Sequence, residues 1–377
     1  MIYVVKNNDT IDIISNLTGV PAQTIAYDNQ IEYPYALAIG QALYIRSPEE
    51  NLREIYVNGY AYPFINREVL VETLKYLSYL SVFSYGFTGG GNLIPPPLDD
   101  TWMINLALGQ AVKPILTLTP FDVDGKFNNR LINTLINNST AVDILISELL
   151  ETLENKGFGG VDIDFEFILA EDRDTFTGFV AKVSENLNRY GYEVSVALAP
   201  KTSADQKGLL YEGKDYGGIG SVANSVLLMT YEWGYKYGPP LAVAPINQVR
   251  RVVEYAVTEI PVSKINLGIP NYAYDWPLPF ERGVTVAETI GNIQAVNRAV
   301  QYGAQIMFDE VAKSPYYTYT LNGTEHVVWF EDVRSIREKF SLINEFNLRG
   351  AGYWEIMRLF RGNWLLLENI FDKISFL

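Results

Sequence analysis

The chain has 377 residues, 48% of them hydrophobic and 13% aromatic, so it can bury the core of at least one large globular domain. Its formal charge of -15 argues against nucleic acid and anionic membranes as partners, because both attract basic surfaces. Cysteine is absent and His326 is the single histidine, which excludes cysteine nucleophiles, disulfides, Cys/His zinc sites and nearly every Ser-His-Asp triad. The chemistry must come from carboxylates, tyrosine, lysine or arginine, and we expect no metal and no cofactor.

The start of the chain carries no conventional export signal. Met1 is followed directly by a strand-like segment, without a basic region and an apolar core, and no stretch is long enough to span a bilayer. We therefore expect a protein outside the ordinary export route, or one whose leader has been removed, and no membrane partner.

Residues 1–47 predict a compact β-α-α-β unit. A strand over 2–5 is followed by the N-cap signal Asn8-Asp9-Thr10, two short helices that end near Asn29, and a closing strand over 40–45. A small fold of this kind without a ligand is one interpretation.

The unit resembles a LysM domain, a module that binds glycans containing N-acetylglucosamine, such as peptidoglycan and chitin. The resemblance implies that Asp9, Thr10 and Asn29 belong to its glycan-binding residues. Asn8 replaces the glycine that is usual in the family, and both residue types tolerate a left-handed turn. The matching residues are Tyr3, Val5, Asp9-Thr10-Ile11, Asn29, Gly40-Gln41, Leu43 and Ile45.

After a short polar linker, Ser47-Pro48-Glu49-Glu50, strand-like and helix-like segments alternate to the C-terminus. This alternation predicts an α/β fold, a (β/α)8 TIM barrel over residues 48–377 with its site at the carboxyl ends of the strands. A doubly wound open sheet is the alternative. The predicted strands cover 54–62, 79–87, 113–119, 158–166, 193–199, 225–231, 264–271 and 349–354. The helical patterns include 66–78, 127–156, 171–189, 244–259 and 331–346.

The segment between the seventh and eighth predicted strands is too long for one helix. It contains a helical pattern over 284–302 and then three β-like runs, the last two joined by the hairpin signal Asn322-Gly323. We expect an α+β insertion over 275–330 that rises beside the mouth of the barrel and deepens its pocket into a groove. His326 falls in this hairpin, where we expect a surface or packing role. The β-like runs cover 305–309, 315–320 and 325–330.

The fourth predicted strand carries three acids separated by single apolar residues, Asp162, Asp164 and Glu166. In a β-strand, alternation sends all three to one face, with neighbours roughly 6.6 Å apart. Repulsion at that spacing raises at least one pKa and keeps a proton available for a general acid. A calcium site would need a glycine-rich turn around the ion, and a purely structural row of acids would be costly to bury.

The three acids end the run Gly159-Gly160-Val161-Asp162-Ile163-Asp164-Phe165-Glu166. It resembles the signature Asp-Gly-x-Asp-x-Asp-x-Glu of family 18 glycoside hydrolases, with Gly159 in place of the first Asp. The resemblance implies a retaining, substrate-assisted reaction in which the substrate's own N-acetyl oxygen attacks C1. It assigns proton donation to Glu166, orientation of the 2-acetamido group to Asp164, and a buried electrostatic role to Asp162.

Two further strand ends match this family. The sixth strand ends in Met229-Thr230-Tyr231-Glu232, which resembles the family's Met-x-Tyr-Asp and implies that Tyr231 binds the acetamide carbonyl. The eighth ends in Trp354, which matches the tryptophan on which the sugar at subsite -1 stacks. The other candidates for substrate contacts near strand ends are Tyr85, Glu232, Trp233 and Tyr60, with Tyr62, Trp102, Tyr235 and Trp276 as further stacking candidates.

The third predicted strand departs from the chitinases of this family, because it reads Leu116-Thr117-Leu118-Thr119 where they show Ser-x-Gly-Gly. With Gly159 and the LysM unit, this departure favours a resemblance to bacterial LysM-bearing N-acetylglucosaminidases that degrade spore cortex peptidoglycan. The expected reaction is hydrolysis of β-1,4 bonds after N-acetylglucosamine in peptidoglycan, and the expected location is the spore coat or cortex or the cell wall. A chitinase and an inactive glycan-binding lectin are the alternatives; lectins of this fold usually lose the acid, which is present here as Glu166.

Overall fold

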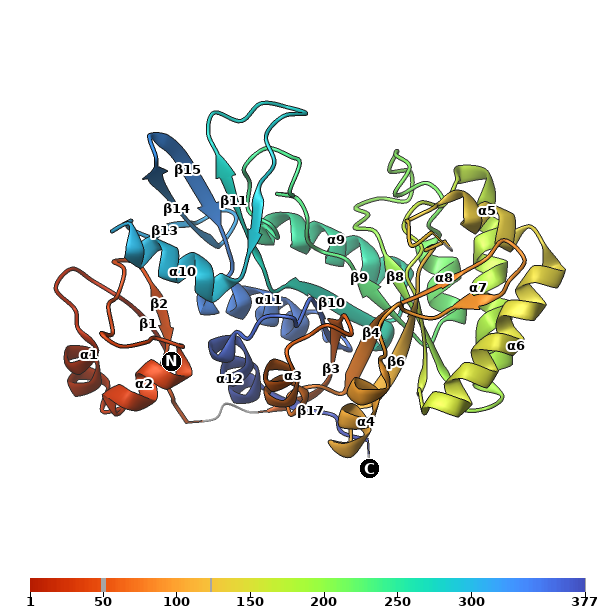
Figure 1. The fold of residues 1–377 in the computed structure, drawn as a ribbon, viewed down its shortest axis with the longest axis horizontal. Helices are drawn as coiled ribbons and strands as arrows, with labels where there is room; N and C mark the ends of the chain where they lie inside the picture. The colour runs from red at the N-terminus through yellow and green to blue at the C-terminus, as the bar shows by residue number, and fades with distance from the viewer. Residues whose placement is uncertain (49–51, 123, 377) are drawn as a thin grey trace.

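The computed structural model describes residues 1–48, 52–122 and 124–376, and eight of its strands close into a parallel barrel (Figure 1). Neighbouring strands pair in chain order, and the first of them, β3, also pairs with the last, β16, so the sheet has no gap. The predicted TIM barrel is confirmed. Its strands are β3 (Arg53–Ala61), β4 (Tyr79–Phe87), β6 (Lys113–Leu118), β7 (Gly160–Ile163), β8 (Glu193–Leu198), β9 (Ser225–Leu228), β10 (Ile265–Pro270) and β16 (Gly350–Trp354).

Two barrel strands are shorter than predicted. The last register pairs are Leu118 with Ile163 and Leu198 with Leu228, so β7 and β9 end where their preceding neighbours β6 and β8 end. The prediction of strands to 166 and 231 was therefore wrong by three residues at the C-terminal end of each strand. The consequence is functional, because the chain beyond both ends is freed to form the mouth of the barrel.

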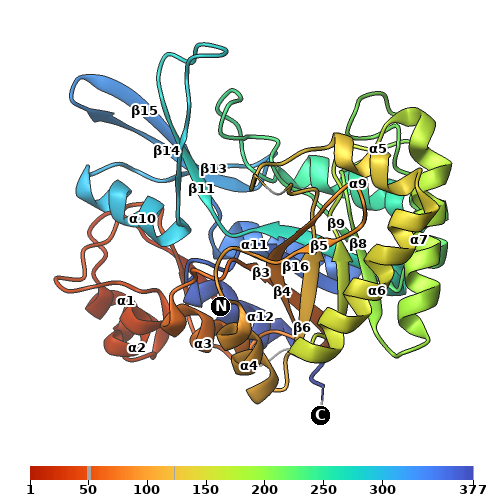
Figure 2. The ribbon, with the colours of Figure 1, turned by 45° about the vertical axis from the view of Figure 1, so that its right-hand side comes forward.

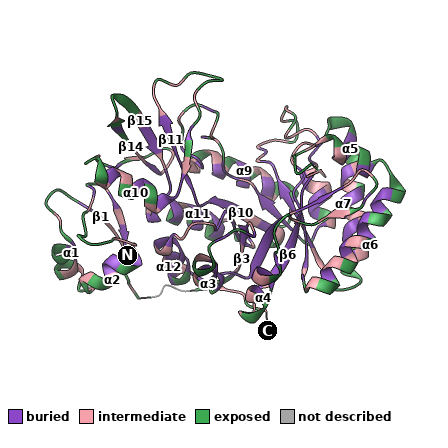
Figure 3. Cartoon of the chain, viewed as in Figure 1, coloured by how far each residue is buried: buried purple, intermediate pink, exposed green. Residues whose placement is uncertain are grey.

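Helices cover the outside of the barrel, and their inner faces are buried against the strands (Figure 3). In α9, Val249, Val252, Val253 and Ala256 are buried at the three- and four-residue spacing of one helix face. The helix predicted over 127–156 is two helices, because Asn138 accepts a hydrogen bond from the Ala141 N–H and starts a new one. The helices are α3 (Arg67–Leu74), α4 (Thr101–Gly109), α5 (Arg130–Ile136), α6 (Ser139–Lys156), α7 (Arg173–Asn188), α8 (Tyr216–Val222), α9 (Ile246–Glu259), α11 (Val333–Glu345) and α12 (Arg361–Ile370). The short strands β5 (Leu93–Ile94) and β17 (Phe371–Lys373) extend the sheet beside β4 and β3.

The N-terminal unit has the predicted β-α-α-β order: β1 (Ile2–Val4), α1 (Ile11–Thr18), α2 (Ala22–Asp28) and β2 (Ala42–Tyr44). Its two strands pair antiparallel, and it has a small core of its own. It lies beside α10, α11 and α12 (Figure 1), with β2 in contact with α11 and α12. In the predicted linker, Glu49 and Glu50 lie outside the described residues.

The segment between β10 and β16 forms the predicted α+β insertion. An antiparallel five-stranded sheet stands beside the barrel and is accompanied by α10 (Asn292–Gln301) (Figure 2). The helix begins at Asn292 rather than 284, because residues 288–290 form an edge strand. The strands in sheet order are β12 (Glu288–Ile290), β11 (Ala273–Pro277), β15 (Thr324–Trp329), β14 (Ser314–Leu321) and β13 (Met307–Asp309).

His326 lies on β15 with its Nδ1 2.8 Å from a carboxyl oxygen of the buried Asp275, so its contact is internal to the insertion. Of the helices in the part of the chain that the structure describes, none is long and apolar enough to cross a membrane.

Candidate active site

The alternation of β7 continues past its last paired residue and separates the acids from the apolar residues. Phe165 turns outward and packs on Phe87 and Phe179, with ring centroids 5.3 and 5.8 Å away. Asp164 keeps a strand-like bond, because its N–H donates to the Leu118 carbonyl at 2.9 Å. The three carboxylates therefore follow one another up the inside of the barrel toward its mouth.

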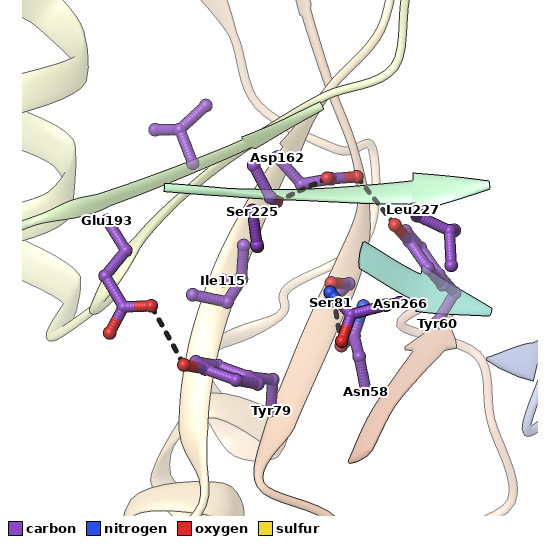
Figure 4. Close-up of a pocket in the computed structure, with 12 residues that line it drawn as sticks. Asn58, Tyr60, Tyr79, Ser81, Ile115, Asp162, Glu193, Ser225, Leu227 and Asn266 are labelled. Carbon is purple, nitrogen blue, oxygen red and sulfur yellow. Dashed lines mark hydrogen bonds between the residues drawn. The ribbon is translucent and has the colours of Figure 1, made fainter. Parts of the chain in front are cut away.

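Asp162 is the lowest of the three and lies in the barrel interior. Its carboxylate accepts hydrogen bonds from the Tyr60 hydroxyl at 2.8 Å, shown in Figure 4, and from the Ser195 hydroxyl at 2.5 Å. Burial raises the pKa of Asp162, while the two hydroxyl donors lower it. Beside it the barrel leaves a cavity of only about 30 Å³, room for water and not for a sugar.

Asp164 and Glu166 lie above Asp162 at the mouth. Burial raises the pKa of Asp164, and the charges of Glu166 and Asp162 raise it further; burial also raises the pKa of Glu166. Asp164 is 7% exposed, and its Oδ1 has no hydrogen-bond partner among the described residues. A carboxyl in such surroundings retains its proton at higher pH than usual, which is what a general acid requires.

Lys214, which belongs to none of the sequence motifs, reaches the backbone between these two acids. Its side chain is fully buried, and its Nζ donates to the carbonyl of Phe165, the residue between the two upper acids. Burial lowers the pKa of Lys214 to about 8, against the raising effect of Asp164 and Glu166. A lone lysine in the long loop after β8 carries no sequence signal; only the fold brings it to the acids.

The carboxylates open into a pocket of about 630 Å³ at the mouth of the barrel. Its apolar floor includes Trp354, whose ring meets those of Phe83 and Tyr60 edge-on at centroid distances of 4.9 and 5.8 Å. The structure thus joins Asp164, Glu166, Tyr231, Glu232, Trp354 and Tyr60 at one pocket, together with Phe83, Phe167, Ala197, Leu210, Leu227, Met229 and Tyr235.

Tyr231 and Glu232 form one wall of the pocket. Tyr231 is 9% exposed, and burial together with the negative charges of Asp164 and Glu166 raises its pKa, so its hydroxyl keeps the proton it can donate. Glu232 accepts hydrogen bonds from the hydroxyls of Tyr272 and Tyr274, the second at 2.9 Å. The insertion therefore braces this wall through Tyr274 of β11, while the pocket itself is lined by the barrel.

Two candidates are not brought to the pocket. Tyr85 is buried on the outside of β4, where its hydroxyl donates to Asp100 at 2.6 Å. Trp233 packs against the barrel core, and its backbone N–H donates to the Val243 carbonyl at 3.1 Å. Among the additional stacking candidates, Trp276 is fully buried in the insertion and Trp102 lies on α4. An aromatic side chain near a strand end can point either into the mouth of the barrel or toward the surrounding helices. The sequence alone did not resolve which direction Tyr85 and Trp233 take.

The first two glycines of the signature run lie at the start of β7, away from the mouth. A Cβ on Gly159 would meet the Lys113 side chain at 2.2 Å, and Lys113 pairs with Glu193 at 2.6 Å. The position that is Asp in the family signature is thus closed here by Lys113. Gly159 bears on packing at the barrel bottom and cannot contact a substrate at the mouth.

In the N-terminal unit, the candidates Asp9, Thr10 and Asn29 all make internal bonds. Asp9 accepts from the Lys6 N–H at 2.7 Å and from the Tyr3 hydroxyl at 2.8 Å. Thr10 caps α1 through the Ile13 N–H, and the Asn29 side chain bonds the backbone of Ile25 and Tyr44. These three residues hold the unit together, and a glycan contact by any of them stays a prediction.

Two shallower hollows continue the pocket on either side. One of about 330 Å³ shares Phe83 with it and is lined by aromatic and proline residues including Phe64 and Pro96; the other, of about 380 Å³, shares Phe167 and includes Arg130. The mouth is therefore longer than one sugar ring. Within the described ranges, no group of three or more His, Asp or Glu side chains is arranged to hold a metal ion.

Comparison with known proteins gives consistent matches. The model of glycosyl hydrolases family 18 matches residues 122–358, and that of the LysM domain matches residues 3–46. A cortical fragment-lytic enzyme of Bacillus subtilis strain 168 is 39% identical over 99% of each chain, and a putative sporulation-specific glycosylase of that strain, YdhD, is 35% identical over 97% of this chain and 86% of its own. The crystal structure of the spore cortex-lytic enzyme SleL from Bacillus megaterium QM B1551 is similar with a TM-score of 0.83 and 36% identity, covering 99% of this chain and 87% of that chain.

Proposed function

Because the chain belongs to family 18 of the glycosyl hydrolases and carries an N-terminal LysM domain, we propose that it hydrolyses β-1,4 bonds after N-acetylglucosamine in peptidoglycan. The substrate is spore cortex fragments, and the site of action is the spore coat or cortex or the cell wall. The similarity to cortex-lytic enzymes over 99% of the chain supports the choice of polymer. The observation that carries the chemistry is that Asp164 and Glu166 line one pocket with Tyr231 and Trp354.

In the proposed reaction Glu166 donates its proton to the glycosidic oxygen, so the bond to C1 breaks as the leaving hydroxyl forms. The substrate's acetamide oxygen attacks C1 and forms an oxazolinium ion, which water then opens with Glu166 acting as base. The raised pKa of Glu166 supports the first role. Glu232 is held by two tyrosine hydroxyls, which argues against its use as a free nucleophile.

The remaining pocket residues have roles that follow from their chemistry. Asp164, with one unpaired carboxyl oxygen, orients the acetamide and stabilises the positive charge that develops on it. The protonated Tyr231 hydroxyl binds the acetamide oxygen. Trp354 supplies the apolar floor on which the reacting sugar stacks, with Tyr60 both beside it and bonded to Asp162.

The three parts of the chain then divide the work. Residues 1–47 bind the glycan and residues 48–377 cleave it. Tyr274 of β11, directly before the range 275–330 expected for the insertion, supports the wall that carries Tyr231. A module that binds the same polymer raises the local concentration of the bond to be cut. The hollows on both sides of the pocket provide room for neighbouring sugars of a strand.

The test is Glu166→Gln, assayed by release of reducing ends from purified cortex fragments. The variant keeps the size of the side chain and removes the transferable proton, so we expect turnover to fall by roughly 100- to 10,000-fold with an unchanged fold. Turnover close to that of the unmodified enzyme would refute the acid assignment. Fragments whose glucosamine lacks the acetyl group should be inert, since they lack the attacking oxygen.

Comparing chitin oligomers with cortex fragments decides the polymer. Faster cleavage of chitin would make the protein a chitinase with the same mechanism. Glycan binding without any release of reducing ends by the unmodified protein would favour a lectin.

A further inference from the structure

Lys214 is a buried charge that the mechanism above does not use. Lysine is rarely buried without a carboxylate partner, yet here the Nζ bonds only backbone, the Phe165 carbonyl, and no ion pair is formed within 4.0 Å among the described residues. The ring centroid of Phe176 on α7 lies 5.1 Å from Nζ. Because the side chain is fully buried, water screens its charge little.

We propose that Lys214 is a positioning residue of the active site, whose buried positive charge keeps one carboxyl of the upper acid pair ionised while the other holds the proton. This inference rests on the proposed function, because that reaction needs Glu166 protonated and Asp164 ionised at the same time. It concerns a residue in the loop between β8 and α8, outside every matched motif of the sequence.

The charges around the pair single out Lys214. The groups that act on Asp164 are Glu166, Asp162 and Lys214, and the only cation among them is Lys214; it is also the cation that acts on Glu166. From β3 and the end of β9, Tyr60 and Tyr231 face the same acids as neutral hydroxyls. Glu232, on the wall of the same pocket, is a further carboxyl, and the charge of Glu166 raises its pKa. Without the ammonium, the acid row and Glu232 would share the space with no cation among these groups.

The bond to Phe165 fixes where this charge sits. Phe165 lies between Asp164 and Glu166 in the chain, and its ring is clamped on the opposite side by Phe87 and Phe179. Its carbonyl is therefore a rigid anchor, and an ammonium held by it stays close to both acids at once. Lys201 Nζ donates to the backbone carbonyl of Lys214 at 3.0 Å, a bond to the main chain, so the position of the Lys214 ammonium itself is set by the Phe165 carbonyl.

The sign of the effect follows from the charge. An ammonium favours the ionised form of a nearby carboxyl, so Lys214 lowers the pKa of both acids relative to the values that burial and mutual repulsion would set. The pKa of Lys214 is about 8, so this charge is present at neutral pH and is lost as the pH rises through that value.

The experiment measures kcat/KM for cortex fragments from pH 4 to 9 with the unmodified enzyme, Lys214→Met and Lys214→Arg. In Lys214→Met, which keeps the bulk and removes the charge, we expect both limbs of the profile to move to higher pH by about one unit. The acid limb moves because Asp164 ionises later, and the alkaline limb because Glu166 keeps its proton longer. Lys214→Arg should restore the position of both limbs, whatever its absolute rate.

The matched control is Lys201→Met. Lys201 is also buried, lies in the same loop and has a Nζ bonded to backbone carbonyls, but the carboxylates whose charges raise its pKa are Asp215, Glu259 and Asp205 and not the acids of the pocket. It should leave both limbs in place even where it lowers the melting temperature. Limbs unmoved in Lys214→Met, or moved equally in Lys201→Met, would overturn the proposal.

Different results would contradict the proposed function and the proposed role of Lys214. If the unmodified enzyme does not cleave cortex fragments or chitin oligomers, the proposed function fails. If it does and the profile of Lys214→Met is unshifted, the proposed function stands, and Lys214 serves only to satisfy the Phe165 carbonyl. Should Lys214→Met not fold, Lys214→Gln offers a neutral hydrogen-bond donor for the same carbonyl and carries the same expected shift.

Discussion

The folded protein disfavours the ionised form of the Asp164 side chain. It is 7% exposed, one of its oxygens is unpaired among the described residues, and both nearest acids repel its charge. Asp100 is the contrasting case, because its buried carboxylate accepts from Tyr85 and pairs with Lys156. Removing the charge should therefore relieve the fold at Asp164, whereas at Asp100 it would leave Lys156 without its partner.

We predict that Asp164→Asn stabilises the protein at pH 7 by about 1–2 kcal/mol while abolishing most activity. The folded protein holds the Asp164 proton at pH values where the unfolded chain, with a pKa of about 3.9, has lost it. Stability is therefore lost as the pH rises from about 4 through the folded-state pKa. The gain of the variant should vanish near pH 4.

Denaturant unfolding at pH 4 and pH 7 measures this, with Asp100→Asn as the control. That variant should be less stable than the unmodified protein at pH 7, because it leaves Lys156 without its partner. If Asp164→Asn were no more stable than the unmodified protein at pH 7, the free-energy cost assigned to burying the charged Asp164 beside two acids would be wrong.

How far the sequence predicts the site depends on where each side chain points. Glu166 and Tyr231 could be placed because motif and alternation agree, and both line the pocket. Tyr85 could not, because the residue sits in a strand whose two faces are both apolar, and a buried aromatic fits either. Lys214 could not be predicted from the sequence, because only the tertiary fold of a long loop brings it to the acids.

At the scale of elements, β7 is packed closely at its start, and its pairing with both neighbouring strands ends at Ile163. Gly160 lies so close to β8 that a Cβ would meet the Glu193 carbonyl oxygen at 2.2 Å, whereas one on Gly159 would meet only the flexible Lys113 side chain. The sequence predicted eight strands in the right order from the alternation of patterns, but placed the ends of β7 and β9 too far. The alternation of apolar and polar residues continues into the mouth of the barrel, whereas hydrogen-bonded strand pairing stops where the preceding strand ends.

We predict that Gly160→Ala destabilises the protein by about 1–3 kcal/mol or more, because two backbones must separate to admit the methyl group. Gly159→Ala should cost less than about 1 kcal/mol, since Lys113 can swing aside and its partly exposed pair with Glu193 contributes little. Urea unfolding of the two variants, one residue apart, makes the comparison. Equal losses would show that the register of β7 against β8 is not as described.

At the scale of the molecule, the LysM domain is docked on the barrel rather than tethered to it. Arg361 of α12 donates to the Tyr27 carbonyl, stacks over the Tyr27 ring at 3.9 Å and pairs with Glu72 of α3. On the other side the Ile306 N–H donates to the Ile39 carbonyl at 2.8 Å. A docked module fixes where a bound glycan strand lies relative to the cleft, which a flexible tether would not do.

Gly40 offers a way to break this docking. Its φ is +84°, and a Cβ there would meet the Ile306 carbonyl oxygen at 1.9 Å, so Gly40→Ala should push the domain off the insertion. By calorimetry we expect the unmodified protein to unfold in one transition and the variant to show a separate, earlier transition for the LysM domain. Gly19→Ala is the control, because Gly19 has φ +75° in the same domain with no atom within 4 Å of the added methyl, and it should add only local strain.

The activity of Gly40→Ala then separates fixed geometry from simple tethering. If docking sets the position of the glycan, the variant should cleave short soluble fragments at an unchanged rate and intact cortex several-fold more slowly, while Gly19→Ala behaves like the unmodified enzyme on both. Equal loss on both substrates would mean that the damage reaches the barrel. No loss on intact cortex, with the early transition present, would mean that the domain acts by raising local concentration alone, and that its contacts through Arg361 and Ile306 serve stability and not the placement of the substrate.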